Sequence, residues 1–339
     1  MNKRLTRKAR RRARRIRQGI SAVCVLVLLL GGLYIYQIGE GYAREKEMNA
    51  RLKDAYYSVK YEVQQTAEPE LENSSATAEP LLAVEELQMA AASSVSDENT
   101  LALENSAAPE NSAAPAEPEL TPAPTPEEPV LQPEFEALYE ENPDTIGWIQ
   151  MADTVDYPIL WRDNTFYMDH DFDGNRSEGG AIFLDERNVS DMSDSAMLIY
   201  GHNMKNGTMF GELDRYRKGE YLSQYPVITI QSAWESEPRK YVLISLFDAS
   251  MNRSDPSYIK IIRTTFEKPE DKEAFIAEMC ERSFFDIDLE TTAEDQLVTL
   301  VTCSYTHNNG RFLLFARELH EDETEEQILE AFKAMDFAK

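Results

Sequence analysis

Two apolar runs toward the C-terminal end, QLVTLVTC (residues 296–303) and RFLLFAR (residues 311–317), decide the fold. Both are short and apolar on both faces, which is typical of central strands buried within a sheet. The loop between them, SYTHNNG, is polar and contains Asn-Asn-Gly, a common turn sequence. The two runs therefore predict a buried hairpin in which Cys303 and Arg311 face each other at the loop end.

Six further runs with strand character precede this hairpin. They are TIGWIQM (145–151), TVDYPIL (154–160), GAIFLD (180–185), AMLIYG (196–201), YPVITIQ (225–231) and KYVLISLF (240–247). Helical stretches are expected at 133–142, at about 207–218, at 269–283 and at 322–335. About eight short strands favour a closed barrel or a sandwich over a doubly wound sheet. We therefore expect one mostly β domain with peripheral helices over residues 133–339.

An apolar run near the N-terminus, ISAVCVLVLLLGGLYIY (20–36), contains no charged residue. With its flanks it gives a segment at 19–38, close to the ~20 residues that cross a bilayer as a helix. Residues 1–18 hold ten Lys or Arg and no acid. The positive-inside rule then predicts a single-pass anchor in the plasma membrane, with this basic tail in the cytoplasm and the body of the chain outside. A cleaved signal peptide is the alternative, but no clear small-x-small site follows the run.

The segment between this anchor and the expected β domain changes composition once. Residues 39–65 have mixed charge and helical composition, which predicts a juxtamembrane helix. Residues 66–132 are rich in Ala, Glu, Pro and Ser, and the hexapeptide ENSAAP occurs there twice in tandem. Such a segment has too few large apolar residues to bury, so we expect a disordered spacer. A spacer outside an anchor suggests that the folded part works at some distance from the bilayer.

The charge balance limits the classes of partner. The formal net charge is −27, and outside the basic tail the chain has 24 basic against 61 acidic residues. A nucleic acid would be repelled by such a body, so we expect no nucleic acid among its partners. The three cysteines, Cys24, Cys280 and Cys303, are too few for a disulfide framework.

The end of the predicted hairpin brings together groups that suit thiol chemistry. A cation beside a thiol lowers its pKa and favours the nucleophilic thiolate, so Arg311 would activate Cys303. The alternatives are that Cys303 is a small buried hydrophobic residue and that Arg311 is a solvated strand end. On the pattern of residues alone, the two interpretations are about equally supported.

A thiol nucleophile usually needs a histidine partner, and the chain has four histidines. His202 follows the apolar run AMLIYG and so lies at the end of a predicted buried strand. His307 lies in the hairpin loop and is the chief rival, whereas His170 and His320 have the surroundings of surface residues. We favour His202 because a strand end gives a more rigid placement than a loop.

Three aspartates at alternate positions, Asp169, Asp171 and Asp173, resemble the start of a calcium loop. Counted from Asp169, an EF-hand loop needs Gly at its sixth position and Glu at its twelfth. Gly174 satisfies the first requirement, but Gly180 occupies the twelfth position. We interpret the segment as an acidic turn and expect neither a metal nor a cofactor.

Several segments match a known family. TLVTC (299–303) resembles the TLxTC signature of sortases, and IYGHNM resembles the segment that carries the sortase histidine, here His202. The sortase arginine that follows the nucleophile falls on Arg311. The resemblance covers about 133–319 and is closest to class B. The segments that carry it are FEALYEENPDTIGWIQM, DYPIL, DNTFYMDHDFDG, GAIFLDERN, GHNMKNGTMFGEL and the helical stretch at 269–283, which is similar to the class B insertion.

This resemblance implies a closed, mainly antiparallel sortase-type β-barrel and a cysteine transpeptidase of the peptidase-like hydrolases. Cys303 would be the nucleophile, His202 the general acid and base, and Arg311 the donor to the oxyanion. Asn164 matches a position that lines the class B substrate groove, although Asn after Asp is also an ordinary turn residue. Thr302 would help through its backbone or hydroxyl, unless it is only a strand former.

The implied partners are secreted proteins that end in a sorting motif of the Pro-x-Thr type and a peptidoglycan precursor or cell-wall amine that accepts them. Two alternatives remain at this stage. One is a sortase of another class that polymerises pilins, against which the helical insertion argues. The other is a non-catalytic, membrane-tethered ectodomain that binds cell-wall ligands, with Cys303 in a structural role.

Overall fold

The computed structural model describes residues 7–74, 130–260, 263–306 and 309–337, and within the N-terminal helix it describes side chains only from residue 14 to 63. His307, the rival histidine, lies outside the described residues. So does most of the segment at 66–132, for which we predicted a disordered spacer.

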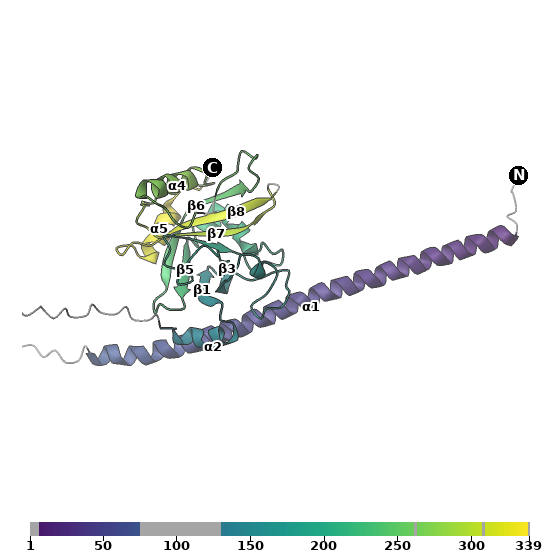
Figure 1. Ribbon diagram of the computed structural model, residues 1–339, viewed down its shortest axis with the longest axis horizontal. Coiled ribbons are helices and arrows are strands. Elements are labelled where there is room, and N and C mark those ends of the chain that lie inside the picture. The colour runs from purple at the N-terminus through teal and green to yellow at the C-terminus, as the bar shows by residue number, and fades with distance from the viewer. Residues whose placement is uncertain (1–6, 75–129, 261–262, 307–308, 338–339) are drawn as a thin grey trace, which may run out of the picture. The chain divides into compact units, whose positions relative to one another are not determined.

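The folded part after residue 130 contains a closed barrel of eight strands (Figure 1). The strands are β1 (Thr145–Met151), β2 (Val155–Trp161), β3 (Phe183–Leu184), β4 (Ala196–Tyr200), β5 (Val227–Ser232), β6 (Arg239–Ser250), β7 (Leu297–Ser304) and β8 (Gly310–Glu318). Their order around the barrel is β1-β2-β3-β4-β7-β8-β6-β5. Only β2–β3 and β4–β7 are parallel pairs, so the barrel is mainly antiparallel, as predicted.

The strands form where the sequence places short apolar runs. Every residue of β7 except Cys303 is buried, and the β8 segment Phe312–Ala316 is fully buried. Leu300 of β7 lies opposite Leu314 of β8 in the register, and both belong to the main core. Such strands are apolar on both faces because both faces are covered by protein. The predicted hairpin is therefore confirmed as the β7–β8 pair.

Short helices surround the barrel. They are α2 (Pro133–Glu141), η1 (Phe166–Met168), η2 (Gly211–Arg217), α3 (Gly219–Leu222), α4 (Pro269–Glu281) and α5 (Glu325–Ala334). The stretch expected at 207–218 begins later than predicted and forms the 3₁₀ helix η2. Its first residues cannot be helical, because Gly207 and Met209 have φ of 83° and 52°.

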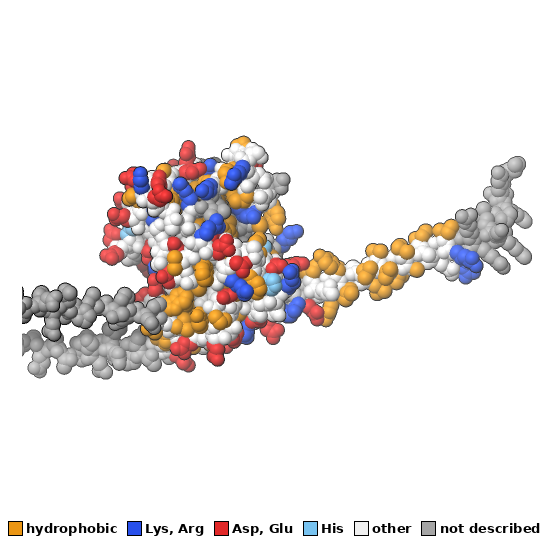
Figure 2. Space-filling model, in the orientation of Figure 1, with side chains coloured by type: hydrophobic (Ala, Val, Ile, Leu, Met, Phe, Trp, Pro, Cys, Tyr) orange, Lys and Arg blue, Asp and Glu red, His pale blue; other side chains and the backbone are white. Residues whose placement is uncertain are grey.

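The longest element is α1 (Arg7–Ser74), a single helix that includes both the apolar run and the charged segment after it. By length and composition it contains one stretch that could cross a membrane, and no part of that stretch is buried in protein. Figure 2 shows the apolar side chains along the part of α1 that extends past the barrel. The domain boundary expected at residue 65 falls inside this helix.

The second half of α1 packs on the barrel. Met48, Leu52 and Tyr56 are buried at helical spacing, and the Tyr56 ring stacks on Trp148 of β1 with centroids 4.3 Å apart. The Tyr56 hydroxyl donates a hydrogen bond to Gln231 of β5 at 2.7 Å. These contacts make residues 45–60 part of the same folded unit as the barrel, within the segment 39–65 for which we expected a juxtamembrane helix.

Candidate active site

Cys303 and Arg311 lie opposite each other at the loop end of the β7–β8 hairpin, where the register pairs their Cα atoms. The Arg311 guanidinium donates a hydrogen bond to the carbonyl of Gly310 at 2.9 Å, through Nη1. Among the described residues, Arg311 forms no ion pair with a carboxylate. The remaining donors of this cation can therefore bind an anion or a carbonyl oxygen.

His202 reaches the same place from a different strand. β4 and β7 are parallel neighbours, and Tyr200 pairs with Val301 in their register. Parallel strands end at the same edge of a sheet, so the residue that follows Tyr200 and Gly201 arrives beside the residue that follows Val301 and Thr302. The His202 ring therefore lies beside the Cys303 thiol, and each group shifts the pKa of the other.

The ionisation of this pair follows from its contacts. The His202 side chain lowers the pKa of the Cys303 thiol against the opposing effect of burial, and the Arg311 cation lowers it further. The contact with Cys303 raises the pKa of His202 in turn. His202 Nε2 also donates to the Met168 carbonyl at 2.6 Å, and a carbonyl can only accept. These contacts favour the ion pair of a thiolate and an imidazolium.

A second cysteine gives the contrast. Cys280 is half-buried in α4, and burial raises the pKa of its thiol. Its Sγ makes only a long contact of 3.9 Å with the carbonyl of Ile244. Cys280 therefore stays a neutral thiol at a pH where Cys303 is already ionised.

Three hydrogen bonds fasten the His202 turn to the end of β7. The Gly201 N–H donates to the Val301 carbonyl at 3.2 Å, and the Thr302 hydroxyl donates to the Gly201 carbonyl at 2.8 Å. The Asn203 amide donates to the Cys303 carbonyl at 2.9 Å. The turn therefore cannot shift along β7 without breaking these bonds, and the contact between His202 and Cys303 is fixed by the backbones that carry them.

These contacts also settle where the Thr302 hydroxyl points. Thr302 is 2% exposed, and its hydroxyl donates its hydrogen bond to the Gly201 carbonyl. Thr302 therefore helps to hold the His202 turn in place. Asn203 was missed in the sequence, because an Asn after a histidine in a turn gives no signal of its own. Its partner lies 100 residues away and is known only from the fold.

A cavity of about 270 Å³ opens over the three reactive groups. Its lining includes all five residues predicted for the site, together with others that the sequence did not mark. The full lining is Asn164, Met168, Phe183, Arg187, Tyr200, Gly201, His202, Val301, Thr302, Cys303 and Arg311. The predicted residues are therefore brought together in space, from β7, β8 and the loops after β2 and β4.

A buried carboxylate organises one wall of this cavity. Asp185 is fully buried, and its oxygens accept hydrogen bonds from Tyr200 at 2.9 Å and from Arg187 Nε at 2.6 Å. Although burial opposes the charged form, these donors hold the pKa of Asp185 below its usual range. The Asn164 amide also points to Asp185, at 3.3 Å, and its carbonyl oxygen accepts from the N–H of Glu186. Asp185 thus positions three lining side chains.

The two other histidines in the described part of the chain, His170 and His320, have other partners. His170 stacks on Phe166 and lies 2.7 Å from Asp169, while His320 lies 2.8 Å from Asp295. In the acidic turn, Asp173 pairs with Arg51 of α1 at 2.6 Å. Within the described part of the chain, no three His, Cys, Asp or Glu side chains converge in a way that would hold a metal ion.

Comparisons with known proteins agree with this geometry. The sequence model of the sortase domain matches residues 149–319, from β1 through β8. The chain belongs to the sortase family. Sortases are transpeptidases, so this chain is a transpeptidase of that family.

Similar proteins place it in class B. Sortase B of Listeria monocytogenes is 30% identical over 188 residues, which cover 54% of this chain and 73% of that protein. Sortase B of Staphylococcus aureus is 30% identical over 191 residues, covering 55% and 75%. The crystal structure of Clostridium perfringens sortase B matches with a TM-score of 0.50 at 29% identity, over 54% of this chain and 98% of that one. The chain is thus a class B sortase.

Membership of class B accounts for helix α4, which is not one of the barrel strands. Helix α4 lies between β6 and β7 and packs Phe275, Ile276 and Met279 into the main core. We expected a helical insertion of the class B kind at 269–283, and α4 occupies it. The Staphylococcus aureus sortase B–substrate complex, with a TM-score of 0.50 at 27% identity, covers 57% of this chain and 87% of that one.

Proposed function

We propose that this class B sortase cleaves secreted proteins at a C-terminal sorting motif of the Pro-x-Thr type and joins them to a cell-wall amine. We assign Cys303 as the nucleophile, His202 as the general acid and base, and Arg311 as the oxyanion donor. One observation carries the assignment. The Cys303 and His202 side chains lie side by side and shift each other's pKa, one down and one up, beside a guanidinium and in an open cavity.

Acylation is the first half of the proposed reaction. The Cys303 thiolate attacks the carbonyl carbon of the Thr in the motif, and a C–S bond forms as the carbonyl oxygen becomes an oxyanion. The His202 imidazolium then gives its proton to the departing amine as the C–N bond breaks. The products are a thioacyl enzyme and a neutral His202.

Arg311 acts on the charge that develops at the carbonyl oxygen. Its guanidinium is held at the strand end by the carbonyl of Gly310, which leaves other N–H groups directed to the cavity. Donors that are already in place stabilise an oxyanion more than they stabilise the neutral carbonyl, and one such donor typically contributes about 3 kcal/mol.

Transfer to the acceptor reverses these roles. A neutral amine attacks the thioacyl carbon, His202 accepts its proton, and the C–S bond breaks to restore the Cys303 thiolate. An amide bond to the acceptor is formed. Water in place of the amine would give hydrolysis, and on this scheme the peptidase-like, hydrolase activity is the same chemistry with another nucleophile.

The proposed partners follow from the chemistry and from the anchor. They are secreted proteins with a sorting signal, and a peptidoglycan precursor or another cell-wall amine. We place the enzyme in the plasma membrane as a single-pass protein, with residues 1–18 in the cytoplasm and the barrel outside. The support is the basic tail followed by the exposed apolar part of α1. Asn164 remains a proposed substrate-binding residue because it lines the cavity.

A transpeptidation assay tests the proposal. The full chain is incubated with a peptide that contains a Pro-x-Thr motif and with a primary amine, and the joined product is followed by mass spectrometry. We expect product with the native chain and none with Cys303→Ala or His202→Ala. Product formation by Cys303→Ala at the native rate would refute the assignment and revive the non-catalytic interpretation.

A further inference from the structure

Helix α1 connects the proposed membrane span directly to the barrel. The span is expected to end at Ile38, and the first buried side chain after it is Glu45, which is 7% exposed. Residues 39–44 lie between them. At 1.5 Å per residue, this helical connection is only about 9 Å long.

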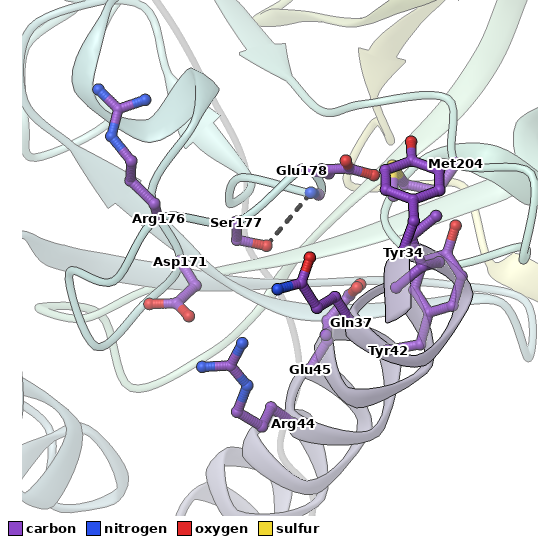
Figure 3. A pocket seen from close by; sticks show the side chains of 13 residues that line it. Tyr34, Gln37, Tyr42, Arg44, Glu45, Asp171, Arg176, Ser177, Glu178 and Met204 are labelled. Carbon is purple, nitrogen blue, oxygen red and sulfur yellow. Dashed lines mark hydrogen bonds between the residues drawn. The ribbon is translucent and has the colours of Figure 1, made fainter. Parts of the chain in front are cut away.

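The contact begins at the level of the span itself. Figure 3 shows a pocket with α1 on one side and two barrel loops on the other. Tyr34, Gln37 and Ile38 line it from the helix. The loops contribute residues 176–179 and Met204. The barrel loops therefore lie beside the outer end of the apolar run.

Buried packing then holds the helix in place. The Glu45 carboxylate fits so closely over Gly179 that a Cβ there would lie 3.3 Å from it. Met48, Leu52 and Tyr56 continue the buried row along the barrel. Burial of large apolar side chains is favourable, so this row opposes detachment of the helix.

The acidic segment at 66–129 comes only after this attachment. The Lys60 ammonium of α1 donates a hydrogen bond to the Gln231 side-chain oxygen at 2.6 Å. The Gln231 amide in turn donates a hydrogen bond to the Glu134 carboxylate of α2 at 2.6 Å. The chain thus leaves the barrel and returns to it at one place. A segment with both ends at the barrel cannot set the distance between the barrel and the membrane, so the spacer role expected from the sequence does not follow.

From these contacts we propose that the face of the barrel formed by residues 171–179 and 204–206 lies against the headgroup layer of the bilayer, held there by α1. The partner is a phospholipid surface. Tyr34, Tyr36 and Tyr42 are exposed at this level of the helix, where amphipathic rings favour the interface. The proposal rests on the membrane span and is independent of the roles of Cys303 and His202.

Charge contributes little to this contact. Arg44 and Arg176 line the pocket, but Asp171 and Glu178 line it too, and Arg176 pairs with Asp169 at 2.8 Å. Such a face is close to balanced and is attracted weakly to anionic lipid. The packing of α1 therefore carries the placement, and added salt should leave it unchanged.

The placement affects the substrates. Met168, whose carbonyl accepts from His202, precedes the first of these loops, and Met204 lies two residues after His202. The cavity is thus lined by chain segments that lead directly into the membrane face. Proteins and amines at the bilayer surface are accordingly within its reach.

Energy transfer in vesicles tests the proposal. The full chain, with Cys24→Ser, Cys280→Ser and Cys303→Ala, is reconstituted in vesicles of phosphatidylglycerol and phosphatidylethanolamine with an acceptor dye on the headgroups. A donor dye is attached at Lys205→Cys or at Glu237→Cys. Glu237 is close to Lys60, more than twenty residues along α1 from Ile38. We expect stronger transfer from position 205 than from position 237, at low and at high salt.

Replacement of residues 66–129 by a short Gly/Ser linker is the decisive comparison. We expect no change in transfer from either position. If the segment were the spacer, its 64 residues would hold the barrel at about 45 Å as a flexible coil, and the replacement would raise transfer sharply. Equal, weak transfer from both positions in the native chain would overturn the proposal. Failure of the chain to float with the vesicles would overturn it as well, and would also refute the anchor while leaving transpeptidation in solution intact.

Discussion

The lowered pKa of Cys303 depends on groups that converge from three places in the sequence. The thiol itself ends a buried strand, the histidine follows another strand, and the guanidinium begins the next one. Burial alone would raise its pKa, as it does at Cys280. The His202 side chain reverses the sign of the shift, and Arg311 adds to it. The neighbours of Cys303 therefore decide its chemistry.

Substitution of His202 tests whether this histidine lowers the pKa of the Cys303 thiol. His202→Ala removes the group that lowers the pKa of Cys303, so the inflection in the rate of alkylation by iodoacetamide should move to higher pH. The native chain should react at a lower pH than free cysteine, because its thiolate forms earlier. His170→Ala is the matched control, since that ring stacks on Phe166 away from the thiol. An unchanged inflection in His202→Ala would contradict the assignment.

Substitution of Arg311 separates binding of the oxyanion from activation of the thiol. Arg311→Ala should reduce transpeptidation by roughly 100- to 1000-fold, the usual effect of losing one oxyanion donor. Because Arg311 also lowers the pKa of Cys303, the comparison is made at a pH where the thiol of both proteins is fully ionised. There the alkylation rates should be similar while the transfer rates still differ. If Arg311→Ala slowed alkylation and transpeptidation by the same factor, Arg311 would act only on the thiol and not on the oxyanion.

At the scale of elements, the parallel β4–β7 pair is what creates the site. It brings the turn Gly201–Asn203 to the end of β7, where three hydrogen bonds hold it. Gly201 suits this turn because a Cβ there would lie 2.5 Å from Ile182 and 2.7 Å from Phe210. The relative position of His202 and Cys303 is thus built into the sheet.

Asn203 provides a test of this positioning. Asn203→Ala removes the bond to the Cys303 carbonyl, and a hydrogen bond of this kind is worth about 1 kcal/mol. We expect a loss of roughly 5- to 10-fold in kcat, with KM nearly unchanged and a shifted pH profile. Asn206→Ala, in the same loop but directed to Thr208, should have little effect. An Asn203→Ala enzyme with native kinetics would show that the turn holds without this bond.

The sequence predicts the strands and helices better than it predicts the contacts between them. Eight apolar runs coincide with eight strands because burial on both faces leaves a clear pattern. The TLVTC and GHN segments bring Cys303 and His202 into the prediction. The Asp185 cluster was missed, since its bonds to Arg187 and Tyr200 depend on how β3 and β4 meet.

Helix α1 is the clearest difference between expectation and structure. Its charged composition at 39–65 resembles that of a solvent-exposed helix. Three of its apolar residues, Met48, Leu52 and Tyr56, recur every four residues and form the buried row. Trp148 and Gln231, which receive Tyr56, lie far away in the sequence, so their partner could not be identified from composition.

The stability of the whole molecule tests whether α1 belongs to the folded unit. Tyr56→Ala removes a fully buried ring and its hydrogen bond, and such truncations typically cost 3–5 kcal/mol. We expect a lower midpoint of denaturation for the barrel, followed by the near-ultraviolet signal of its tryptophans. Tyr61→Ala, an exposed position on the same helix, is the control and should leave the midpoint unchanged. If both variants unfold at the native midpoint, α1 is not part of the cooperative unit.

At the scale of the whole chain, we propose that a membrane anchor is joined to a thiol transpeptidase. The barrel and its reactive groups belong to a family whose sequence model spans β1 to β8. On the proposal made above, helix α1 connects that barrel rigidly to the bilayer. The enzyme would therefore meet its secreted substrates where they leave the membrane.

The most direct measurement is the intact mass of the enzyme after incubation with a Pro-x-Thr peptide and no acceptor amine. The account predicts an added mass equal to the peptide fragment that ends at Thr, and digestion should locate this fragment on Cys303. Addition of a primary amine should remove it and release the joined product. A fragment located on Cys280, or peptide cleavage with no adduct on Cys303, would contradict the central claim.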